Sequence, residues 1–368
     1  MSKILFLVNH DVVIYNFRLE LVERLLKEGH EVIISSPYGE KIEILKNIGC
    51  QYRNIDISRH GMNPVKEIKL LYEYNKVIKE EKPDVVLAYT IKPNIYGSIA
   101  CAMNKIPCIN NITGLGTAVE NGGMLQKMTV MLYKVAFRKV KKIFFQNEEN
   151  LLFFVEKNIA NSDKYQLIPG SGVNLERFCL MEYPMEKEKI EFAFISRIMK
   201  EKGIDQYLDA AKYIKKKYPN TIFHVCGFCE QDYEEKLKKM SEEGVIIYHG
   251  MVQNVKSILE KIHCTVHPTY YPEGISNVLL ESAACGRPII TTDRSGCREV
   301  IENEKNGFIC KQKDSEDIIK QIERFISLSW EEKKNMGIKG REKVEREFDR
   351  NIVIDAYLTE IADCEKNI

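Results

Sequence analysis

Runs of apolar residues alternate with stretches of helical spacing along the first half of the chain. The runs that predict strands lie at residues 4–8, 32–35, 51–56, 84–89, 107–112 and 141–146. Apolar residues three and four apart predict helices at 40–48, 64–80, 94–104, 124–139 and 147–158. Asn16 is expected to cap a further helix that runs to about Lys27 and stops at Gly29. This alternation is typical of a doubly wound parallel sheet, so we predict an α/β domain.

The same alternation restarts after a break. Residues 168–178 are rich in turn formers, and the charged stretch 181–189 has no clear period, so we place a domain boundary here. Further strands are predicted at 192–195, 222–226, 245–248, 264–267, 288–292 and 307–310, and helices at 204–217, 314–328, 331–347 and 350–363. The prediction is therefore two Rossmann-like domains, 1–172 and 173–350, followed by a C-terminal helix within 351–368.

Composition limits the class of protein. The chain has 368 residues, enough for about two domains. It is 44% hydrophobic and 29% charged with a net charge of +1, which is typical of a soluble globular protein and gives no indication of a nucleic-acid partner. No run of about 18 apolar residues predicts a membrane span, and the first residues predict a strand rather than a signal peptide. Eleven cysteines, an odd number scattered through apolar segments, fit reduced thiols in the cytoplasm.

Two groups of residues raise a metal or redox alternative. Cys226 and Cys229 have the spacing of a redox motif, but they follow a predicted strand, and no second cysteine pair lies near them in the sequence. His263, Cys264 and His267 lie along one predicted strand and are interpreted as core or edge residues. We therefore predict no metal site.

The stretch from Pro272 to Pro288 carries the most chemistry. It joins two predicted strands and predicts a loop followed by a helix, whose first turn faces the carboxyl edge of the sheet, where open α/β sheets bind ligands. Gly274 allows a ligand to approach the backbone closely. The free amides of the first turn suit a phosphate, and they belong to Ile275, Ser276, Asn277 and Val278.

Two carboxylates and two cations complete this pattern. Glu273 precedes the helix and Glu281 lies two or three turns into it, and both are better suited to accept hydrogen bonds from sugar hydroxyls than to bind phosphate. Arg197 at a strand end and Lys202 at a helix start can hold a diphosphate and stabilise it as it leaves. These residues together predict a nucleotide-sugar donor. No Asp-x-Asp motif stands where such a donor would bind, so we expect a reaction that is independent of metal.

Glu273 and Glu281, with seven residues between them, resemble the paired glutamates of the retaining glycosyltransferases of family four, which have the GT-B fold. The similarity extends to Arg197 and Lys202 and to the stretches Tyr271–Gly274, Asn277–Val278, Gly286–Pro288 and Gly296–Ile301. The resemblance implies two domains facing a central cleft, a UDP-sugar in the second domain, an acceptor in the first, and a last helix that crosses back to the first. It assigns catalysis to Glu273, Arg197 and Lys202, with Glu273 on the donor sugar and Glu281 on the ribose.

Loops of the first domain are expected to line the acceptor side of that cleft. His10 and Arg18, on a loop at 9–18, are candidates to contact the acceptor or a donor phosphate; the alternative for Arg18 is an ion pair with an acid on the first helix. Lys92 lies on a second loop, and Thr113 and Gly114 lie on a third.

Many family members carry histidine on these loops, where this chain has Thr90, Lys92 and Thr113. That departure, together with Arg59, resembles a subgroup that builds capsule and glycan repeats on polyprenyl diphosphate. The resemblance implies a lipid-linked saccharide as acceptor and favours an N-acetylhexosamine as the donated sugar.

Residues 124–142 combine cations with apolar residues and contain no acid. The cations are Lys127, Lys134, Arg138, Lys139, Lys141 and Lys142, and the apolar residues include Met124, Leu125, Met128, Met131, Leu132 and Val135. A basic amphipathic helix can lie on an anionic membrane, which here would be the inner face of the cell membrane. The alternative is an ordinary helix that packs on its own sheet and has a solvated basic face.

A nucleotide-sugar epimerase on the same fold is the alternative function, since it would also bind the donor. Analysis of products separates the two, because an epimerase changes the donor without an acceptor. A nicotinamide-dependent oxidoreductase would need a glycine fingerprint after the first strand, where the chain has Asn9–Val12. We therefore expect a glycosyltransferase.

Overall fold

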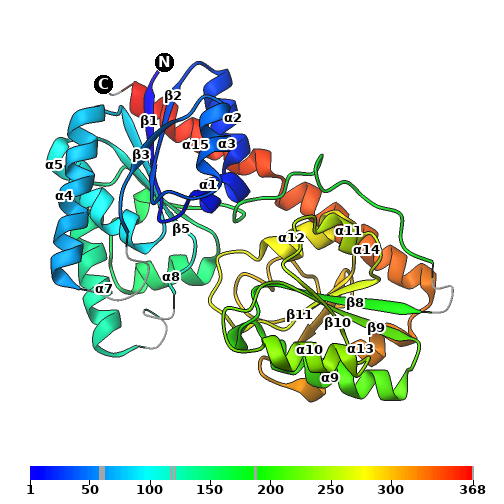
Figure 1. Ribbon diagram of the computed structural model, residues 1–368. Helices are drawn as coiled ribbons and strands as arrows, with labels where there is room; N and C mark the ends of the chain where they lie inside the picture. The colour runs from blue at the N-terminus through cyan, green and yellow to red at the C-terminus, as the bar shows by residue number, and fades with distance from the viewer. Residues whose placement is uncertain (58–62, 117–118, 120–121, 186–188, 367–368) are drawn as a thin grey trace. The chain divides into compact units, whose positions relative to one another are not determined.

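The computed structural model describes residues 1–57, 63–116, 119, 122–185 and 189–366. The chain forms two units (Figure 1). Unit 1 comprises Met1–Ser171 and Asn351–Ile368, and unit 2 comprises Gly172–Arg350. Each unit is described by itself below.

Unit 1 is built on a seven-stranded parallel sheet with the order β3-β2-β1-β4-β5-β6-β7. Its strands are β1 Lys3–Leu7, β2 Glu31–Ser36, β3 Gln51–Asn54, β4 Val85–Tyr89, β5 Cys108–Ile112, β6 Lys142–Phe145 and β7 Tyr165–Leu167. Its helices are α1 Asp11–Phe17, α2 Leu19–Lys27, α3 Ile42–Asn47, α4 Pro64–Glu81, η1 Pro93–Gly97, α5 Ser98–Asn104, α7 Gly123–Ala136, η2 Phe137–Lys139, α8 Glu148–Glu156 and η3 Ser162–Lys164. Strands β1, β4 and β5 are almost entirely buried, because separate apolar clusters cover the two faces of the sheet.

Unit 2 is built on a six-stranded parallel sheet with the order β10-β9-β8-β11-β12-β13. Its strands are β8 Ile190–Ile195, β9 Thr221–Cys226, β10 Ile247–Gly250, β11 Cys264–His267, β12 Ile289–Thr292 and β13 Gly307–Cys310. Its helices are η4 Lys200–Lys202, α9 Ile204–Lys217, α10 Glu234–Glu242, α11 Lys256–Leu259, α12 Asn277–Ala284, α13 Ser315–Ser327 and α14 Trp330–Glu347. As in unit 1, an apolar cluster covers each face of the sheet.

The last helix, α15 Arg350–Glu365, completes the core of unit 1. Val353, Ile354, Tyr357 and Ile361 belong to the cluster on one face of the unit 1 sheet. The hydroxyl of Tyr357 accepts a hydrogen bond of 2.7 Å from the Asn111 side chain at the end of β5. The far end of α15 lies beside β1, where the Glu365 carboxylate accepts a hydrogen bond from the Ser2 hydroxyl. Unit 1 is therefore made from both ends of the chain (Figure 1).

The predicted α/β class with two Rossmann-like domains is confirmed. The first helix differs from the prediction, because it begins at Asp11 rather than at Asn16. The His10 side chain caps it by accepting from the Val12 amide, at 3.2 Å, and a break at Arg18 separates α1 from α2. The expected loop at 9–18 is thus mostly helical. Strand β7 and helices α10 and α11 were not predicted.

None of the helices in the described part of the chain combines the length and the apolar character that a membrane crossing requires. Within the same residues, no group of three or more His, Cys, Asp or Glu side chains is arranged to hold a metal ion. Cys226 is buried at the end of β9. His267 is buried in β11, and His263 is buried directly before it.

Candidate active site

Helix α12 starts at the carboxyl end of β11, where the sequence places the phosphate site. Ser276 is its N-cap, with an extended backbone, and the amide of Ser276 donates to the Gly296 carbonyl at 2.8 Å. The hydrogen bonds of the helix begin with the amides of Leu279 and Leu280, both of which donate to the Ser276 carbonyl. The amides of Asn277 and Val278 therefore have no acceptor within the helix and point out of its first turn. A helix start of this kind attracts an anion.

The loop before α12 is held in place by close backbone packing. Gly296 has a φ of +90°, and a Cβ there would come within 2.5 Å of the Gly274 carbonyl oxygen. Only glycine allows this approach without displacement of the loop. Gly274 and the start of α12 are thereby fixed against the segment that follows β12.

Lys202 and Glu273 form a buried ion pair beside this helix start. The Lys202 ammonium, at the end of η4, contacts the Glu273 carboxylate, and Nε2 of His267 lies 3.7 Å from the same carboxylate oxygen. Burial alone would raise the pKa of Glu273, but the Lys202 charge and the His267 hydrogen bond hold that pKa well below its usual range. Glu273 is therefore an anion at neutral pH and accepts hydrogen bonds.

Arg197 joins the group through Tyr271. Its guanidinium lies 5.3 Å from the centre of the Tyr271 ring, and Lys202 Nζ lies 4.8 Å from the same ring. Arg197 is also paired with Glu230 on the outer side. The structure thus brings Arg197, Lys202 and Glu273 together around the loop that leads into α12.

Glu281 lies further along α12 in a different environment. Burial raises the pKa of Glu281 to about 7, although the charges of Arg177 and Arg350 act in the opposite direction. Its carboxyl group consequently changes charge near neutral pH, whereas Glu273 stays ionised. The two carboxyl groups near this helix start therefore have pKa values that are shifted in opposite directions, which is a common arrangement in sites that bind and transform a ligand.

The predicted site residues of unit 1 are Arg18, treated below, a group at one edge of the sheet, and Arg59. His10, Lys92, Thr113 and Gly114 follow the carboxyl ends of β1, β4 and β5 and thus share one edge of the sheet. Arg59 lies outside the described residues.

Arg18 differs from the prediction. It is 3% exposed, and its guanidinium lies over the rings of Tyr89 and Tyr357, at 5.1 and 5.6 Å. The guanidinium also donates to the Phe17 carbonyl at 2.6 Å. Among the described residues no acid forms the ion pair that was the alternative for Arg18.

Comparison with known proteins agrees with this geometry. Residues 182–343 match the model for glycosyl transferases group 1, and residues 3–147 match the model for a glycosyl transferase 4-like domain. These two matches cover most of both units. The chain is a glycosyl transferase, with a group 1 domain in unit 2 and a 4-like domain in unit 1.

Relatives and solved structures extend the comparison over the full length. This glycosyl transferase is 25% identical to the N,N'-diacetylbacillosaminyl-diphospho-undecaprenol alpha-1,3-N-acetylgalactosaminyltransferase of Campylobacter jejuni, over 97% of both chains. It is 24% identical to the UDP-Gal:alpha-D-GlcNAc-diphosphoundecaprenol alpha-1,3-galactosyltransferase of Escherichia coli, over 71% of this chain and 70% of that one. Anabaena HepE in complex with UDP and glucose shares the fold, with a TM-score of 0.78, 15% identity and coverage of 99% and 100% of the two chains. The fold is GT-B.

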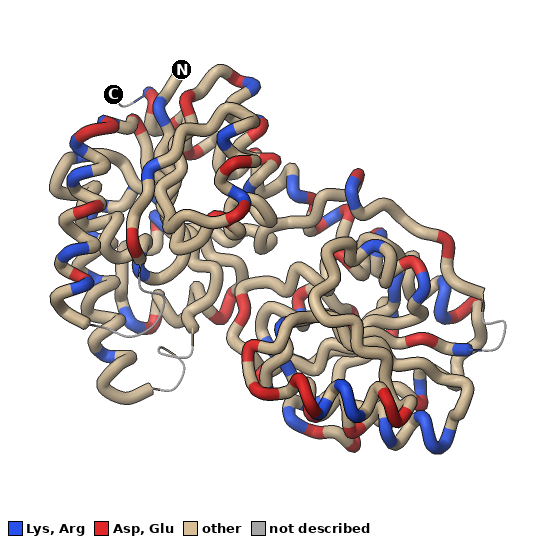
Figure 2. Tube along the Cα trace, viewed as in Figure 1, with Lys and Arg blue, Asp and Glu red and all other residues tan. Residues whose placement is uncertain are grey.

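Helix α7 of the glycosyl transferase exposes apolar and basic residues on the same face. Met124, Met131 and Val135 are 86%, 68% and 54% exposed, and Lys127, Lys134 and the following Arg138 are exposed as well. Figure 2 marks the positions of Lys and Arg along the trace in blue. The side that faces the sheet carries Tyr133 and Ala136. Both expectations for this segment remain open, because α7 packs on its own unit through Tyr133 and Ala136 with a solvated basic face and also exposes apolar side chains. Membrane contact stays a prediction.

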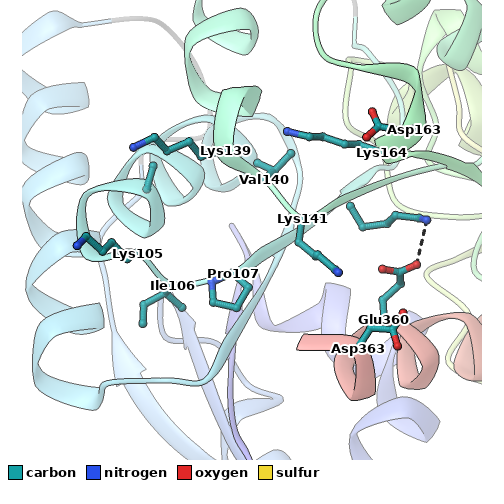
Figure 3. Close-up of a pocket in the computed structure, with 12 residues that line it drawn as sticks. Lys105, Ile106, Pro107, Lys139, Val140, Lys141, Asp163, Lys164, Glu360 and Asp363 are labelled. Carbon is teal, nitrogen blue, oxygen red and sulfur yellow. Dashed lines mark ion pairs between the residues drawn. The ribbon is translucent and has the colours of Figure 1, made fainter. Parts of the chain in front are cut away.

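A lysine-rich pocket of about 690 Å³ lies at the far end of this segment. Figure 3 shows that its lysines come from several segments of unit 1. Lys142 pairs with Glu360 at 2.9 Å, and Lys164 donates to the Arg138 carbonyl. Lys105, Lys139 and Lys141 have no acidic partner among the residues that the structure describes. Residues 124–142 thus end at a cluster of lysines.

Sequence reasoning missed two functional candidates. His267 was interpreted as a core or edge residue, but its Nε2 faces both the Glu273 carboxylate and the Ser276 hydroxyl, the latter at 3.3 Å. Its position at the end of β11, directly before the motif, is the signal that could have identified it. Glu67, the partner of Lys92, was missed because nothing in the sequence separates it from other acids on an exposed-looking helix.

Proposed function

We propose that this glycosyl transferase moves a sugar from a UDP-sugar to a saccharide linked to polyprenyl diphosphate, with retention of the anomeric configuration. The product would enter a capsule, an O-antigen or a related glycan. An N-acetylhexosamine is the donated sugar that we favour. The observation that carries the proposal is the similarity, along nearly the whole of both chains, to the Campylobacter jejuni enzyme, whose name gives a diphospho-undecaprenol substrate and an N-acetylgalactosaminyl group.

The site in unit 2 supports the binding of a nucleoside diphosphate sugar. The amides of Asn277 and Val278 and the cations Arg197 and Lys202 would neutralise the diphosphate, as one helix start and two fixed charges. Glu273, which remains ionised, would accept hydrogen bonds from the hydroxyls of the donated sugar. Glu281 would accept a hydrogen bond from a ribose hydroxyl. A carboxyl group keeps an acceptor oxygen whether it is ionised or protonated, so this bond does not require Glu281 to be charged.

The reaction would break the bond between the anomeric carbon and the phosphate oxygen and form a bond from that carbon to an acceptor hydroxyl on the same face. Attack from the leaving-group side places the acceptor hydroxyl next to the departing phosphate oxygen, which can take its proton. Arg197 and Lys202 would then stabilise the charge that develops on the diphosphate. We expect these residues to suffice without a metal ion.

The acceptor would be presented at the inner face of the cell membrane, since a polyprenyl chain stays in lipid. The exposed methionines of α7, the cations between them and the lysine-rich pocket would form the peripheral contact with anionic lipid. Apolar side chains would enter the boundary of the acyl region while the lysines meet phosphate groups.

A donor screen tests the proposed function. The purified protein is incubated with UDP-sugars that include UDP-N-acetylglucosamine and UDP-N-acetylgalactosamine, together with short-chain polyprenyl diphosphate saccharides. The expected result is a lengthened lipid-linked saccharide whose new linkage has the donor's anomeric configuration by nuclear magnetic resonance. An inverted linkage would contradict retention, and a changed donor without any acceptor would indicate the epimerase alternative.

A further inference from the structure

His267 is a buried histidine at the carboxyl end of β11, close to the start of α12. The residue is 1% exposed, and Nε2 of its ring lies 3.3 Å from the Ser276 hydroxyl and 3.7 Å from the Glu273 carboxylate. Its backbone is fixed, because it pairs with Thr291 in the sheet and its carbonyl accepts from the Thr291 hydroxyl at 2.7 Å. The ring therefore has a defined position beside both the N-cap of α12 and the loop that carries Glu273.

The surroundings of the ring determine where its proton lies. Burial lowers the pKa of His267, and the Lys202 charge acts in the same direction against the Glu273 carboxylate, so the ring is neutral at neutral pH and carries one proton. Nε2 faces the ionised Glu273, which repels a nitrogen lone pair and attracts an N–H group. Nδ1 is buried and has no hydrogen-bond partner among the described residues, so a proton there would be unsatisfied. The proton therefore lies on Nε2.

The hydroxyl of Ser276 does not cap the helix that this residue begins. An N-cap serine usually accepts a hydrogen bond from the amide of the second or third helical residue, here Val278 or Leu279. The Leu279 amide donates to the Ser276 carbonyl at 3.2 Å, and nothing in the described part of the chain accepts from the Val278 amide. The Ser276 hydroxyl accepts from His267 Nε2 instead.

This choice of partner affects the phosphate site directly. A hydroxyl that turned to the helix would take the hydrogen of the Val278 amide and would place its own lone pairs where a phosphate oxygen would bind. The hydroxyl is thus a competitor of the phosphate for the same amide. The hydrogen bond from His267 keeps that competitor occupied.

We propose that His267 is a positioning residue for the donor: its Nε2–H holds the Ser276 hydroxyl away from the first turn of α12, so that the Val278 amide stays available to a phosphate oxygen. The same N–H lies near Glu273 and helps Lys202 to keep that carboxylate in place. This inference rests on the proposed function, because it takes the helix start as the site of the donor's diphosphate. His267 itself would not touch the donor.

Isothermal titration calorimetry with UDP tests the assignment, because UDP presents the diphosphate without the sugar that Glu273 would bind. In His267→Leu the Ser276 hydroxyl loses its partner and can cap α12, so the Kd for UDP should rise by roughly tenfold, the effect of one lost hydrogen bond to a charged group. His267→Asn is polar but too short to reach Ser276 and should behave alike. His267→Gln places an amide N–H near the position of Nε2, so its Kd should stay within about threefold of the wild type.

A second substitution separates this role from a general disturbance of β11. Ser276→Ala removes the hydroxyl that would cap the helix, so the double variant His267→Leu/Ser276→Ala should bind UDP within about threefold of the wild type. A second truncation would not repair a loss of local structure. His263→Leu removes another buried histidine, directly before the other end of β11, and is the matched control with an unchanged Kd.

Turnover distinguishes the two contacts of the ring. Glu273 still lacks the His267 N–H in the double variant, so its kcat should stay about threefold or more below the wild type while UDP affinity recovers. Full turnover in the double variant would remove the contact with Glu273 from the proposal. Wild-type affinity for UDP in His267→Leu, or a loss that Ser276→Ala does not repair, would overturn the inference and leave the proposed function standing. A wild-type protein that does not bind UDP would remove both.

Discussion

Glu273 and Glu281 show how the position of a carboxyl group relative to the start of a helix sets its pKa. Glu273 lies before the helix and contacts Lys202 and His267, so it stays charged. Glu281 lies inside the helix, where the effect of burial on its pKa outweighs the charges of Arg177 and Arg350. The same side chain can thus serve as a permanent acceptor at one position and as a titrating group at the other.

Replacing Glu273 by glutamine should lower kcat by at least about tenfold, because one hydrogen bond to the transition state is lost and Lys202 is left without its counter-charge. Steady-state assays at saturating donor measure the effect. Glu235→Gln, at an exposed acid on α10, is the control and should behave as wild type. Unchanged turnover in Glu273→Gln would remove its proposed role.

Glu281 predicts a pH-dependent difference in stability. The folded state holds the pKa of Glu281 at about 7, above the ordinary value near 4.5, so the folded protein binds a proton that the unfolded chain releases between these pH values. This contribution to stability is present below about pH 4.5 and is lost as pH rises to 7. Glu281→Gln removes this titration. As the pH rises from 5 to 8, the Tm of the variant should therefore rise relative to the Tm of the wild type by roughly 2–6 °C.

Differential scanning fluorimetry at the two pH values measures that difference. Glu331→Gln, at an exposed acid in the first turn of α14, is the control, and its Tm should follow the wild type at both pH values. A Glu281→Gln difference from wild type that does not change with pH would show that the carboxyl group has an ordinary pKa.

At the scale of elements, the junction between η4 and α9 places Lys202. Gly203 has a φ of +78°, and a Cβ there would lie 2.1 Å from the Pro268 carbonyl oxygen. Gly203→Ala should therefore displace the junction, lower Tm and reduce turnover by at least about tenfold. Gly244→Ala is a matched control, because Gly244 has a φ of +71° with no atom within 4 Å of the added Cβ. Equal effects of the two changes on turnover would contradict the steric argument.

Helix α7 carries the prediction of membrane contact. Replacing Lys134, Arg138 and Lys141 by glutamine should weaken sedimentation with vesicles of phosphatidylglycerol and phosphatidylcholine, since each cation near an anionic surface contributes about 1 kcal/mol. The control replaces Lys212, Lys216 and Lys239, exposed lysines of unit 2, with the same change in net charge. Equal sedimentation of the two triple variants would assign the effect to net charge alone.

The order of strands and helices could be predicted because the parallel strands are buried on both faces and so form continuous apolar runs. The first helix was misplaced because Asn16 is a strong capping residue, whereas the actual cap, His10, uses a ring nitrogen that cap statistics rank low. Strand β7 has three residues, too few for a period to appear. Helix α10 buries only Leu237, so its apolar signal was weak.

The candidate site in unit 2 could be predicted further than the one in unit 1. Glu273, Gly274 and α12 lie within one continuous stretch, and proximity in sequence made their proximity in space evident. Glu67 and Lys92 are 25 residues apart, and only the parallel order of the strands brings them together. No local pattern encodes such a pair.

At the scale of the whole molecule, α15 is the element on which unit 1 depends. Tyr357 is almost fully buried, contacts the rings of Tyr89 and Phe144 and accepts from Asn111. Tyr357→Ala should lower the free energy of unfolding of unit 1 by about 3–5 kcal/mol. Far-ultraviolet circular dichroism during urea unfolding measures both units together.

Fluorescence of Trp330, the sole tryptophan of the sequence, separates the units, because it lies in unit 2 and its Nε1 donates to the Pro184 carbonyl. The fluorescence midpoint should move less than the midpoint of the dichroism transition in Tyr357→Ala. Tyr213→Ala, at an exposed tyrosine on α9, should change stability by less than about 0.5 kcal/mol. Coincident shifts by both probes would show that the two units unfold as one.

A unit assembled from both ends of its chain also has a consequence for synthesis. Residues 172–350 emerge from the ribosome as one uninterrupted segment, and every strand of their sheet is available before α15 has been translated. The amino-terminal sheet, although made first, lacks the apolar face of α15 until residues 350–365 have been translated. We therefore expect nascent chains to complete unit 2 before unit 1, the reverse of the usual order, and a stop codon before α15 to destabilise the half that was translated first.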